Sequence, residues 1–336
     1  MCTTFQLRAA DGTVAVGRTM EFPDMLGAML TAIPRGVELV STSPSGDGHH
    51  WTTKYGTVGM DAAGRAQWLT DGINERGLYA GGLYMPGFAE YEEPSTDAER
   101  NLGVLDLTTF VLTTCASVAE AFEALKSLTI WGPVFGPLGA APPLHLVLHD
   151  ASGAAGVVEF EGGAQQHRDN PLGVATNAPY LDWHHNNVRN WLPRMSSANP
   201  GPIEIRGTTI APLAQGQGFT GLPGDSGSAG RYLRASAYVM TMTPSATGAD
   251  LEHDTLHALN NFDIPAGLMT GKDPNGHEQD DQTKWSSVSN LTQLRYIVRL
   301  QANPTPFVVD LATTAFDGGS PRQLELAAGG FASITV

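Results

Sequence analysis

Cysteine is scarce in this chain: only Cys2 and Cys115 occur among its 336 residues. Two cysteines cannot form the disulfide framework of a small secreted protein. Basic residues are also few, with 19 Lys and Arg against 34 Asp and Glu, which gives a formal net charge of −15. Because a field of this sign repels phosphate backbones and anionic lipids, we expect neither nucleic acid nor a membrane as a partner.

Two further absences concern the compartment. No apolar stretch reaches membrane-spanning length, and no positively charged segment followed by an apolar run stands at the N-terminus. The sequence as written therefore predicts a soluble, cytoplasmic protein. A periplasmic or secreted location is expected instead if an export leader has been removed before Met1.

What the chain does have is a thiol in second place, directly after a methionine. Methionine aminopeptidases trim readily before small residues, so loss of Met1 would give Cys2 a free α-amine. A thiol of pKa ~8.5 and an α-amine of pKa ~7.7–8.0 can share a proton near neutrality. One residue can then supply both the nucleophile and its base for cleavage of an amide or ester, and Cys2 is the candidate nucleophile.

Other reactive side chains have simpler interpretations. Cys115 lies at the junction of two apolar helices, where we expect a buried structural thiol and not a Cys/His enzyme. His253 and His257 have the i, i+4 spacing of a zinc site on a predicted helix. No Glu follows His253 and no third ligand suggests itself, so we expect a pair on a helix surface and no metal.

Strand-like alternation on both sides of an Asp-Gly turn predicts a β-hairpin over residues 3–17. Cys2 would stand at the tip of the first strand, and Arg18 and Glu21 at the end of the second. The hairpin therefore predicts that both charged residues come within reach of the Cys2 amine and sulfur.

The remaining chain predicts strands, two helices, strands, helices and strands again. Up to residue 128 the chain is expected to have a loop over 22–30, strands within 33–40, a polar loop over 41–50, strands within 51–60 and 68–70, a turn from 71 leading into a strand, and helices over 104–114 and 117–128. From residue 131 on it is expected to have a loop over 131–143, a hairpin over 144–161, a helix or loop from 182, helices over 228–241 and 250–262, and strands over 285–290, 294–300 and 307–311. This order suits two sheets packed face to face with helices outside, in one domain spanning 1–336.

Several short segments together carry a family resemblance. They are Met1-Cys2-Thr3, Gly17-Arg18-Thr19-Met20-Glu21, Asp71-Gly72-Ile73-Asn74-Glu75-Arg76-Gly77-Leu78, Gly82-Leu83-Tyr84-Met85-Pro86-Gly87, Thr176-Asn177-Ala178-Pro179, Leu222-Pro223-Gly224-Asp225 with Arg231, and Trp285-Ser286-Ser287-Val288-Ser289. In this order the chain resembles the choloylglycine hydrolase family, which contains penicillin V acylases and conjugated bile acid hydrolases within the N-terminal nucleophile hydrolases.

The resemblance implies an α+β protein with a four-layer αββα fold of two mainly antiparallel sheets. It also implies a cofactor-independent hydrolase that acts on carbon–nitrogen bonds in linear amides, with a small N-acyl amide as substrate. Members are commonly tetramers, so a homo-oligomer is expected on the same ground.

The resemblance also assigns roles to single residues. Cys2 is the nucleophile, and the fixed charge of Arg18 favours its thiolate. Asn177 and the backbone N–H of Tyr84 are the donors to the tetrahedral oxyanion, where such a donor is worth ~2.7–4 kcal/mol. Arg231 helps to stabilise charge in the transition state.

Two positions qualify this assignment. Glu21 stands where the family usually has Asp, and its extra methylene predicts an indirect contact with the Cys2 amine. Penicillin V acylases carry Tyr, and bile acid hydrolases often Asn, at the position of Tyr84, which favours a penicillin V acylase-like substrate.

Apolar residues in the segments that frame Cys2 are predicted to hold the acyl group, although each could equally cover the edge of the core. They are Met20, Phe22, Leu26, Met60, Trp131 and Phe135.

Two questions stay open at this point. The substrate could be penicillin V, a conjugated bile acid, an acyl-homoserine lactone or another fatty amide. A function of another class is a non-catalytic ligand-binding protein on the same fold, if Glu21 or a retained Met1 abolishes turnover.

Overall fold

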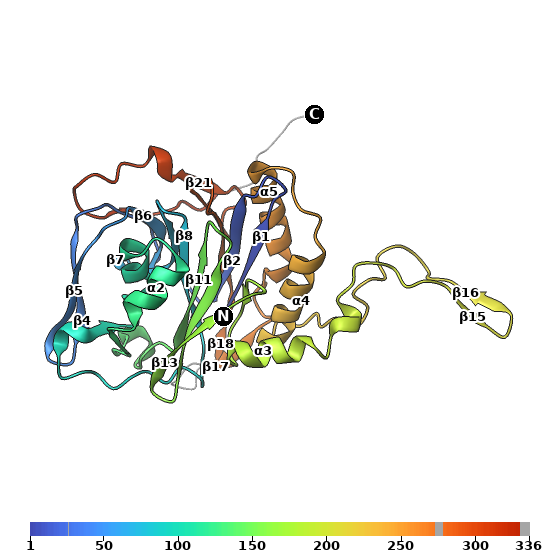
Figure 1. The fold of residues 1–336 in the computed structure, drawn as a ribbon, viewed down its shortest axis with the longest axis horizontal. Coiled ribbons are helices and arrows are strands. Elements are labelled where there is room, and N and C mark those ends of the chain that lie inside the picture. The colour runs from blue at the N-terminus through green and yellow to red at the C-terminus, as the bar shows by residue number, and fades with distance from the viewer. Residues whose placement is uncertain (26, 273–277, 330–336) are drawn as a thin grey trace.

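The computed structural model describes residues 1–25, 27–272 and 278–329. Two large sheets lie face to face at its centre, and helices cover their outer faces (Figure 1). Within both sheets every strand pairing is antiparallel. The predicted α+β fold of four αββα layers is confirmed.

The strands follow a simple spatial order in each sheet. The first sheet runs β14 (Val174–Ala175), β1 (Cys2–Arg8), β2 (Val14–Phe22), β19 (Gln282–Asn290), β20 (Arg295–Leu300) and β21 (Phe307–Asp310). The second sheet runs β13 (Ala164–Asp169), β12 (Ala155–Glu161), β11 (Leu144–Asp150), β8 (Leu78–Tyr84), β7 (Arg65–Asn74), β6 (Thr57–Ala62), β3 (Leu30–Ile33) and β22 (Arg322–Leu324).

The helices form the outer layers. Helices α1 (Leu107–Thr114) and α2 (Val118–Leu125) pack on the second sheet. Helices α4 (Ser228–Thr241) and α5 (Gly248–Leu259) pack on the first sheet, and α3 (Leu181–Val188) packs on α4. In the described residues, no helix combines the length and the apolar character that crossing a membrane requires.

Among the residues that the structure describes, four strand pairs lie outside the two large sheets. They are β4 (Glu38–Ser43) with β5 (Gly46–Thr52), β9 (Asn101–Gly103) with β10 (Thr129–Trp131), β15 (Ile203–Ile205) with β16 (Thr208–Ile210), and β17 (Thr270–Lys272) with β18 (Glu278–Asp280). The β15–β16 hairpin projects far from the body of the molecule (Figure 1).

In the described part of the chain, three clusters of buried apolar residues stabilise the layers. One fills the space between the sheets, with Val16 from the first and Met60 from the second. Another joins the first sheet to α4 and α5, and the last joins the second sheet to α1 and α2. Burial on both faces explains why the central strands consist largely of buried residues.

Most predicted elements are confirmed, including the hairpin of β1 and β2. The cap of α2 is also confirmed, since Ser117 Oγ accepts a hydrogen bond from the Glu120 N–H at 3.2 Å. The polar loop predicted over 41–50 is wrong, because β4 and β5 pair there. Polar residues are compatible with these strands because most side chains of β4 and β5 are exposed, and the buried Ser41 has a partner, its Oγ donating to Asp106 Oδ2 at 2.6 Å.

The turn predicted to begin at Asp71 is also wrong, because Asp71 and Gly72 lie inside β7. A Cβ on Gly72 would stand 2.4 Å from Val58 O, so the glycine permits a close approach of β6 and not a turn. The turn follows at Gly77, which has φ +77°.

Candidate active site

The N-terminal end of β1 brings together groups that the sequence predicts for catalysis. Cys2 is 2% exposed and pairs with Met20 across the hairpin. Its Sγ lies 3.6 Å from Met20 Sδ and 3.5 Å from Arg18 Nη2. Side chains two apart in a strand share a face, so this register places Cys2, Met20 and Arg18 together on the face that looks toward the second sheet.

Arg18 is fully buried and reaches from the first sheet to the second. Its Nη1 donates to Thr70 O at 2.9 Å, and its Nη2 donates to Gly82 O at 2.8 Å. Nη1 also lies 2.9 Å from Asp71 Oδ1. Burial lowers the pKa of Arg18, but the charges of Asp71 and Cys2 more than offset this, so its pKa lies above the ordinary value. The side chain is therefore a permanent cation beside the sulfur.

Asp71 is a residue of the site that the sequence reasoning did not assign. It is fully buried, and it accepts hydrogen bonds from Ser287 Oγ at 2.8 Å and Tyr296 Oη at 3.2 Å. A signal was available, because Asp71 heads one of the segments that carry the family resemblance. Its role became visible only with Arg18 beside it.

Asn177 and Arg231 meet at the backbone of Cys2. Asn177 Oδ1 accepts from the Cys2 N–H at 3.1 Å and from Arg231 Nη2, while Asn177 Nδ2 donates to Tyr84 O at 2.6 Å. Arg231 Nη1 donates to Cys2 O and, at 2.7 Å, to Thr3 Oγ1. Two donors facing Oδ1 and an acceptor facing Nδ2 fix the orientation of the amide.

Glu21 lies on the other face of β2. Adjacent strand residues point to opposite faces, so its carboxylate is turned away from the thiol and toward the helix side, where Arg231 lies. It is fully buried, and Oε1 accepts from Thr283 Oγ1 at 3.0 Å. Burial raises the pKa of Glu21, against the opposing charges of Arg231 and the N-terminus.

Three polar side chains hold the segment before Pro179 and were not predicted. Ser228 Oγ accepts from the Asn177 N–H at 3.1 Å, His184 Nε2 lies 3.1 Å from Asn177 O, and His145 Nε2 lies 3.1 Å from Thr176 O. Burial lowers the pKa of both histidines to about 4. Both are therefore neutral at pH 7 and can each donate one Nε2–H to a carbonyl oxygen.

Met1 is joined to Cys2 and continues the pairing of β1 with β2. Its amine donates to Glu21 O at 2.6 Å, and the Glu21 N–H donates to Met1 O at 2.9 Å. The amine also lies 3.8 Å from Asp281 Oδ2, and Met1 Sδ lies 3.8 Å from Arg231 Nη2. Met1 thus fills the space next to the backbone nitrogen of Cys2.

Among the described residues, those predicted to hold an acyl group differ in their contacts and in their exposure. Met20 contacts the Cys2 sulfur, and Phe22 is half-buried where β2 ends. Met60 is fully buried between the sheets and has no surface free for a substrate in this structure. Leu26 lies outside the described residues.

Trp131 and Phe135 contact residues of strands β4 and β7. Trp131 Nε1 donates to Thr42 O at 2.8 Å, and the Phe135 ring lies edge-on to Trp68 with centroids 5.8 Å apart. A substrate contact for either residue stays a prediction.

The alternative reactive groups lie elsewhere. Cys115 ends α1 and is 2% exposed, as predicted, and burial raises the pKa of its thiol. His253 and His257 lie on α5. In the part of the chain that the structure describes, no group of three or more His, Cys, Asp or Glu residues is placed to hold a metal ion.

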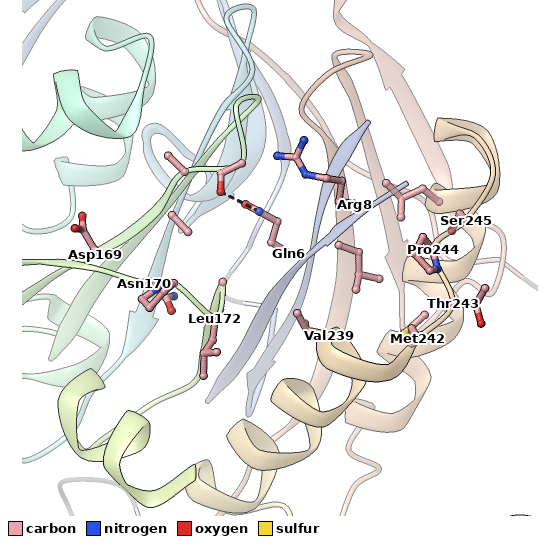
Figure 2. A pocket seen from close by; sticks show the side chains of 17 residues that line it. Gln6, Arg8, Asp169, Asn170, Leu172, Val239, Met242, Thr243, Pro244 and Ser245 are labelled. Atoms are coloured by element: carbon pink, nitrogen blue, oxygen red, sulfur yellow. Dashed lines mark hydrogen bonds between the residues drawn. The ribbon is translucent and has the colours of Figure 1, made fainter. Parts of the chain in front are cut away.

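A cavity of 460 Å³ lies at the opposite end of β1 from Cys2 (Figure 2). Gln6 and Arg8 line it from β1, Leu172 from the segment before β14, and Val239 and Met242 from the end of α4. None of the residues predicted for catalysis lines this cavity.

The fold and the buried N-terminal site are typical of the N-terminal nucleophile hydrolases as a class. Residues 2–322 match the family model described as linear amide C–N hydrolases, choloylglycine hydrolase family. The chain belongs to this family.

Known relatives agree with this assignment. The chain is 29% identical to a bile salt hydrolase/transferase of Clostridium perfringens, over 95% of this chain and 94% of that protein. It is 29% identical to a penicillin V acylase of Pectobacterium atrosepticum, over 92% of this chain and 80% of that protein. The crystal structure of the mutant C2A conjugated bile acid hydrolase from Clostridium perfringens superposes with a TM-score of 0.85 and 26% identity, over 98% of each chain.

Proposed function

We propose that this protein hydrolyses a linear N-acyl amide with Cys2 as nucleophile, through an acyl-thioester intermediate. One observation carries the proposal: the Cys2 sulfur lies 3.5 Å from the buried Arg18 guanidinium, while the Cys2 nitrogen lies 3.1 Å from Asn177 Oδ1. The Cys2 nucleophile therefore has a cation next to its sulfur and a side-chain amide next to its nitrogen.

The reaction needs a free α-amine on Cys2, so Met1 must be removed first. The amine then takes the thiol proton, and the sulfur attacks the amide carbonyl to form a C–S bond. As the C–N bond breaks, the Cys2 ammonium gives its proton to the leaving amine. Water then attacks the thioester, which releases the carboxylic acid and restores the thiol.

Arg18 supports the thiolate, although its charge is shared. Asp71 balances part of that charge at 2.9 Å, so the field at the sulfur is weaker than that of an isolated guanidinium. Arg231 adds a second buried cation next to the Cys2 carbonyl. We propose that the two arginines together stabilise the Cys2 thiolate and the negatively charged tetrahedral intermediate.

The oxyanion site would consist of Asn177 Nδ2 and the Tyr84 N–H. Leu144 is paired with Tyr84, but its N–H donates to Tyr91 Oη at 2.7 Å, while the Met85 N–H donates to Pro143 O at 2.6 Å. Because bonded and non-bonded pairs alternate along an antiparallel ladder, the Tyr84 N–H faces away from β11.

Asn177 meets Tyr84 on that same side. The N–H and C=O of one strand residue point the same way, and Asn177 Nδ2 donates to Tyr84 O at 2.6 Å. The two proposed donors therefore share one edge of β8, next to the Cys2 nitrogen. Two donors on one oxyanion are the arrangement that acyl transfer requires.

Glu21 would act indirectly. Its carboxylate is turned away from the sulfur and is buried near Arg231, which itself donates to Cys2 O and Asn177 Oδ1. We propose that Glu21 orients Arg231 and the end of β2, in place of a direct contact with the Cys2 amine.

The substrate we propose is penicillin V acylase-like, with conjugated bile acids and acyl-homoserine lactones as the alternatives. A panel of these amides, scored by release of the amine, tests the activity on enzyme whose intact mass shows that Met1 is gone. Hydrolysis of at least one amide supports the proposal. Processed enzyme that binds these amides without turnover supports a non-catalytic binding protein instead.

We also propose that residues 1–336 act as one domain and assemble as a homo-oligomer, with a tetramer expected from the family resemblance. The projecting β15–β16 hairpin supports this, because Ile203, Ile205 and Ile210 are each about half exposed on it. Sedimentation of the wild type and of the double variant Ile203→Asp, Ile210→Asp tests the assembly. A monomeric wild type at micromolar concentration contradicts it.

A further inference from the structure

Met1 occupies the space beside the nucleophile as a small ligand would. Its amine contacts Glu21 O at 2.6 Å and lies 3.8 Å from Asp281 Oδ2, and its Sδ lies 3.8 Å from Arg231 Nη2. Once Met1 is removed, another molecule can take this space. The groups that now face Met1 will then face that molecule.

The leaving amine of a substrate must enter this space. In the proposed mechanism the Cys2 α-amine protonates the leaving nitrogen, so the two nitrogens must come within hydrogen-bond distance. In the present structure the atoms next to the Cys2 nitrogen on that side are those of Met1. Substituents on the leaving amine therefore pass along the path that Met1 marks.

Asp281 is the acidic side chain at the end of that path. It lies between β18 and β19, where its N–H donates to Met269 O at 2.9 Å and Gln279 Nε2 donates to its Oδ1 at 3.2 Å. The side chain is 19% exposed, and Oδ2 is the oxygen that faces the Met1 amine. Burial, and then the charge of Asp281, raises the pKa of Tyr84, so the carboxylate also lies within electrostatic range of the Tyr84 hydroxyl.

The nearby cations are engaged by the protein. Arg231 donates from Nη1 to Cys2 O and Thr3 Oγ1, from Nη2 to Asn177 Oδ1 and from Nε to Ser226 O. Arg18 lies on the other face of the first sheet, paired with Asp71. Glu21 lies near Arg231, and its charge opposes that of Arg231.

We propose that Asp281 is a specificity-determining residue that disfavours amides with an anionic amine portion and favours neutral or cationic ones. The inference rests on the proposed hydrolase function. It concerns the amine portion alone and leaves the proposed acyl group unchanged. A penicillin, or a conjugate of glycine or taurine, is still hydrolysed, but with a lower kcat/KM than a neutral amide of the same acid. A single charge at this distance and exposure corresponds to a factor of about 5–10 in kcat/KM.

Three amides of phenoxyacetic acid test this, because they share one acyl group and differ in the charge of the amine portion. N-phenoxyacetylglycine is anionic, its glycinamide analogue is neutral, and the mono-amide of ethylenediamine is cationic. We expect wild type to prefer the neutral and cationic amides. In Asp281→Asn, which keeps the acceptor for Gln279, the ratio of kcat/KM for the cationic over the anionic amide should fall about 5–10-fold.

A matched control separates local from global charge. Asp47→Asn removes the same charge from an exposed site on β5 and should leave that ratio unchanged. Raising the salt concentration should reduce the ratio in wild type and have less effect in Asp281→Asn. Equal ratios in wild type and Asp281→Asn, with the amides still hydrolysed, overturn the inference alone. Absence of hydrolysis of all three amides, and of the wider panel, by processed wild type overturns the proposed function and the inference with it.

Discussion

The two ends of strand β1 differ in what they bury. At the Cys2 end, Arg18, Glu21 and Arg231 are all fully buried. The two arginines donate to backbone carbonyls, and Glu21 accepts a hydrogen bond from Thr283 Oγ1. At the other end, Arg8 is exposed and donates to Ser152 O at 2.7 Å beside a cavity of 460 Å³ (Figure 2). The cavity lies at the Arg8 end of β1, and the candidate active site lies at the Cys2 end.

This difference teaches that cavity size does not locate the site in this protein. Burying several charged side chains is costly unless each has a partner, so a dense and paired cluster marks a place with a function. The cluster also surrounds the one residue that can acquire a free α-amine. The following predictions test the contrast between the two ends, from the largest expected effect to the smallest.

The largest effect is expected for Cys2→Ala. If Cys2 is the nucleophile, turnover of the preferred amide should fall by about 10⁴-fold or more. Cys115→Ala, which removes the other thiol, should leave kcat per folded molecule unchanged. Undiminished turnover in Cys2→Ala, measured by amine release, contradicts the assignment.

The buried ion pair should dominate stability. Removing one partner leaves an uncompensated buried charge, so Asp71→Ala should lower the free energy of unfolding by about 3–5 kcal/mol. Arg8→Met at the cavity end should change it by no more than about 0.5 kcal/mol, because its guanidinium is exposed. Urea unfolding of both variants measures the difference. Equal losses of unfolding free energy in Asp71→Ala and Arg8→Met would contradict the proposed difference between the two ends of β1.

A buried asparagine at each end of β1 allows catalysis to be separated from packing. Asn177→Ala should lower kcat by about 10²–10³-fold, because it removes a proposed oxyanion donor. Asn170 lines the cavity end and donates to Val174 O at 3.0 Å. Asn170→Ala should lower stability while kcat per folded molecule stays at the wild-type value, and a matching loss of kcat in both variants argues against the oxyanion role.

The smallest effect is expected from the buried histidines, which should make the free energy of unfolding depend on pH. Burial lowers the pKa of His184 to about 4, below the ordinary value of about 6.5. The folded state then binds fewer protons than the unfolded state, so stability is fully present above pH ~6.5 and is lost as the pH falls toward 4, by up to ~1.4 kcal/mol per pH unit for one histidine.

His184→Gln should reduce that slope, because glutamine can still donate to Asn177 O but does not titrate. His149, which contacts Gln6 near the cavity, has its pKa lowered to about 3 by burial, so His149→Gln should reduce the slope as well. Only His184→Gln should also alter kcat. Thermal unfolding between pH 4 and 7 with parallel kinetics checks both, and an unchanged slope in His184→Gln is the contrary result.

Local patterns were enough to predict part of the site. The alternation around the first turn fixed the hairpin and thereby placed Arg18 beside Cys2. The same alternation implies that Glu21 faces away from Arg18, because adjacent residues of a strand point to opposite faces. Asn177 and Arg231 were assigned by resemblance alone, since no local pattern links residues so far apart in the chain.

The remaining parts of the site depend on tertiary contacts. Asp71 lies in an Asp-Gly segment that predicts a turn, and only the approach of Arg18 from the other sheet reveals its role. His145 and His184 stand in unrelated segments and are brought together by the fold around Thr176 and Asn177. No spacing in the sequence could indicate such a pair.

Trapping the acyl-enzyme tests the central claim most directly. Processed enzyme is mixed with its preferred amide, quenched in acid and digested, and the N-terminal peptide is weighed by mass spectrometry. The account predicts a peptide that begins at Cys2 and carries one acyl group on that residue. An acyl group on another residue, or turnover by protein that still begins with Met1, would contradict it.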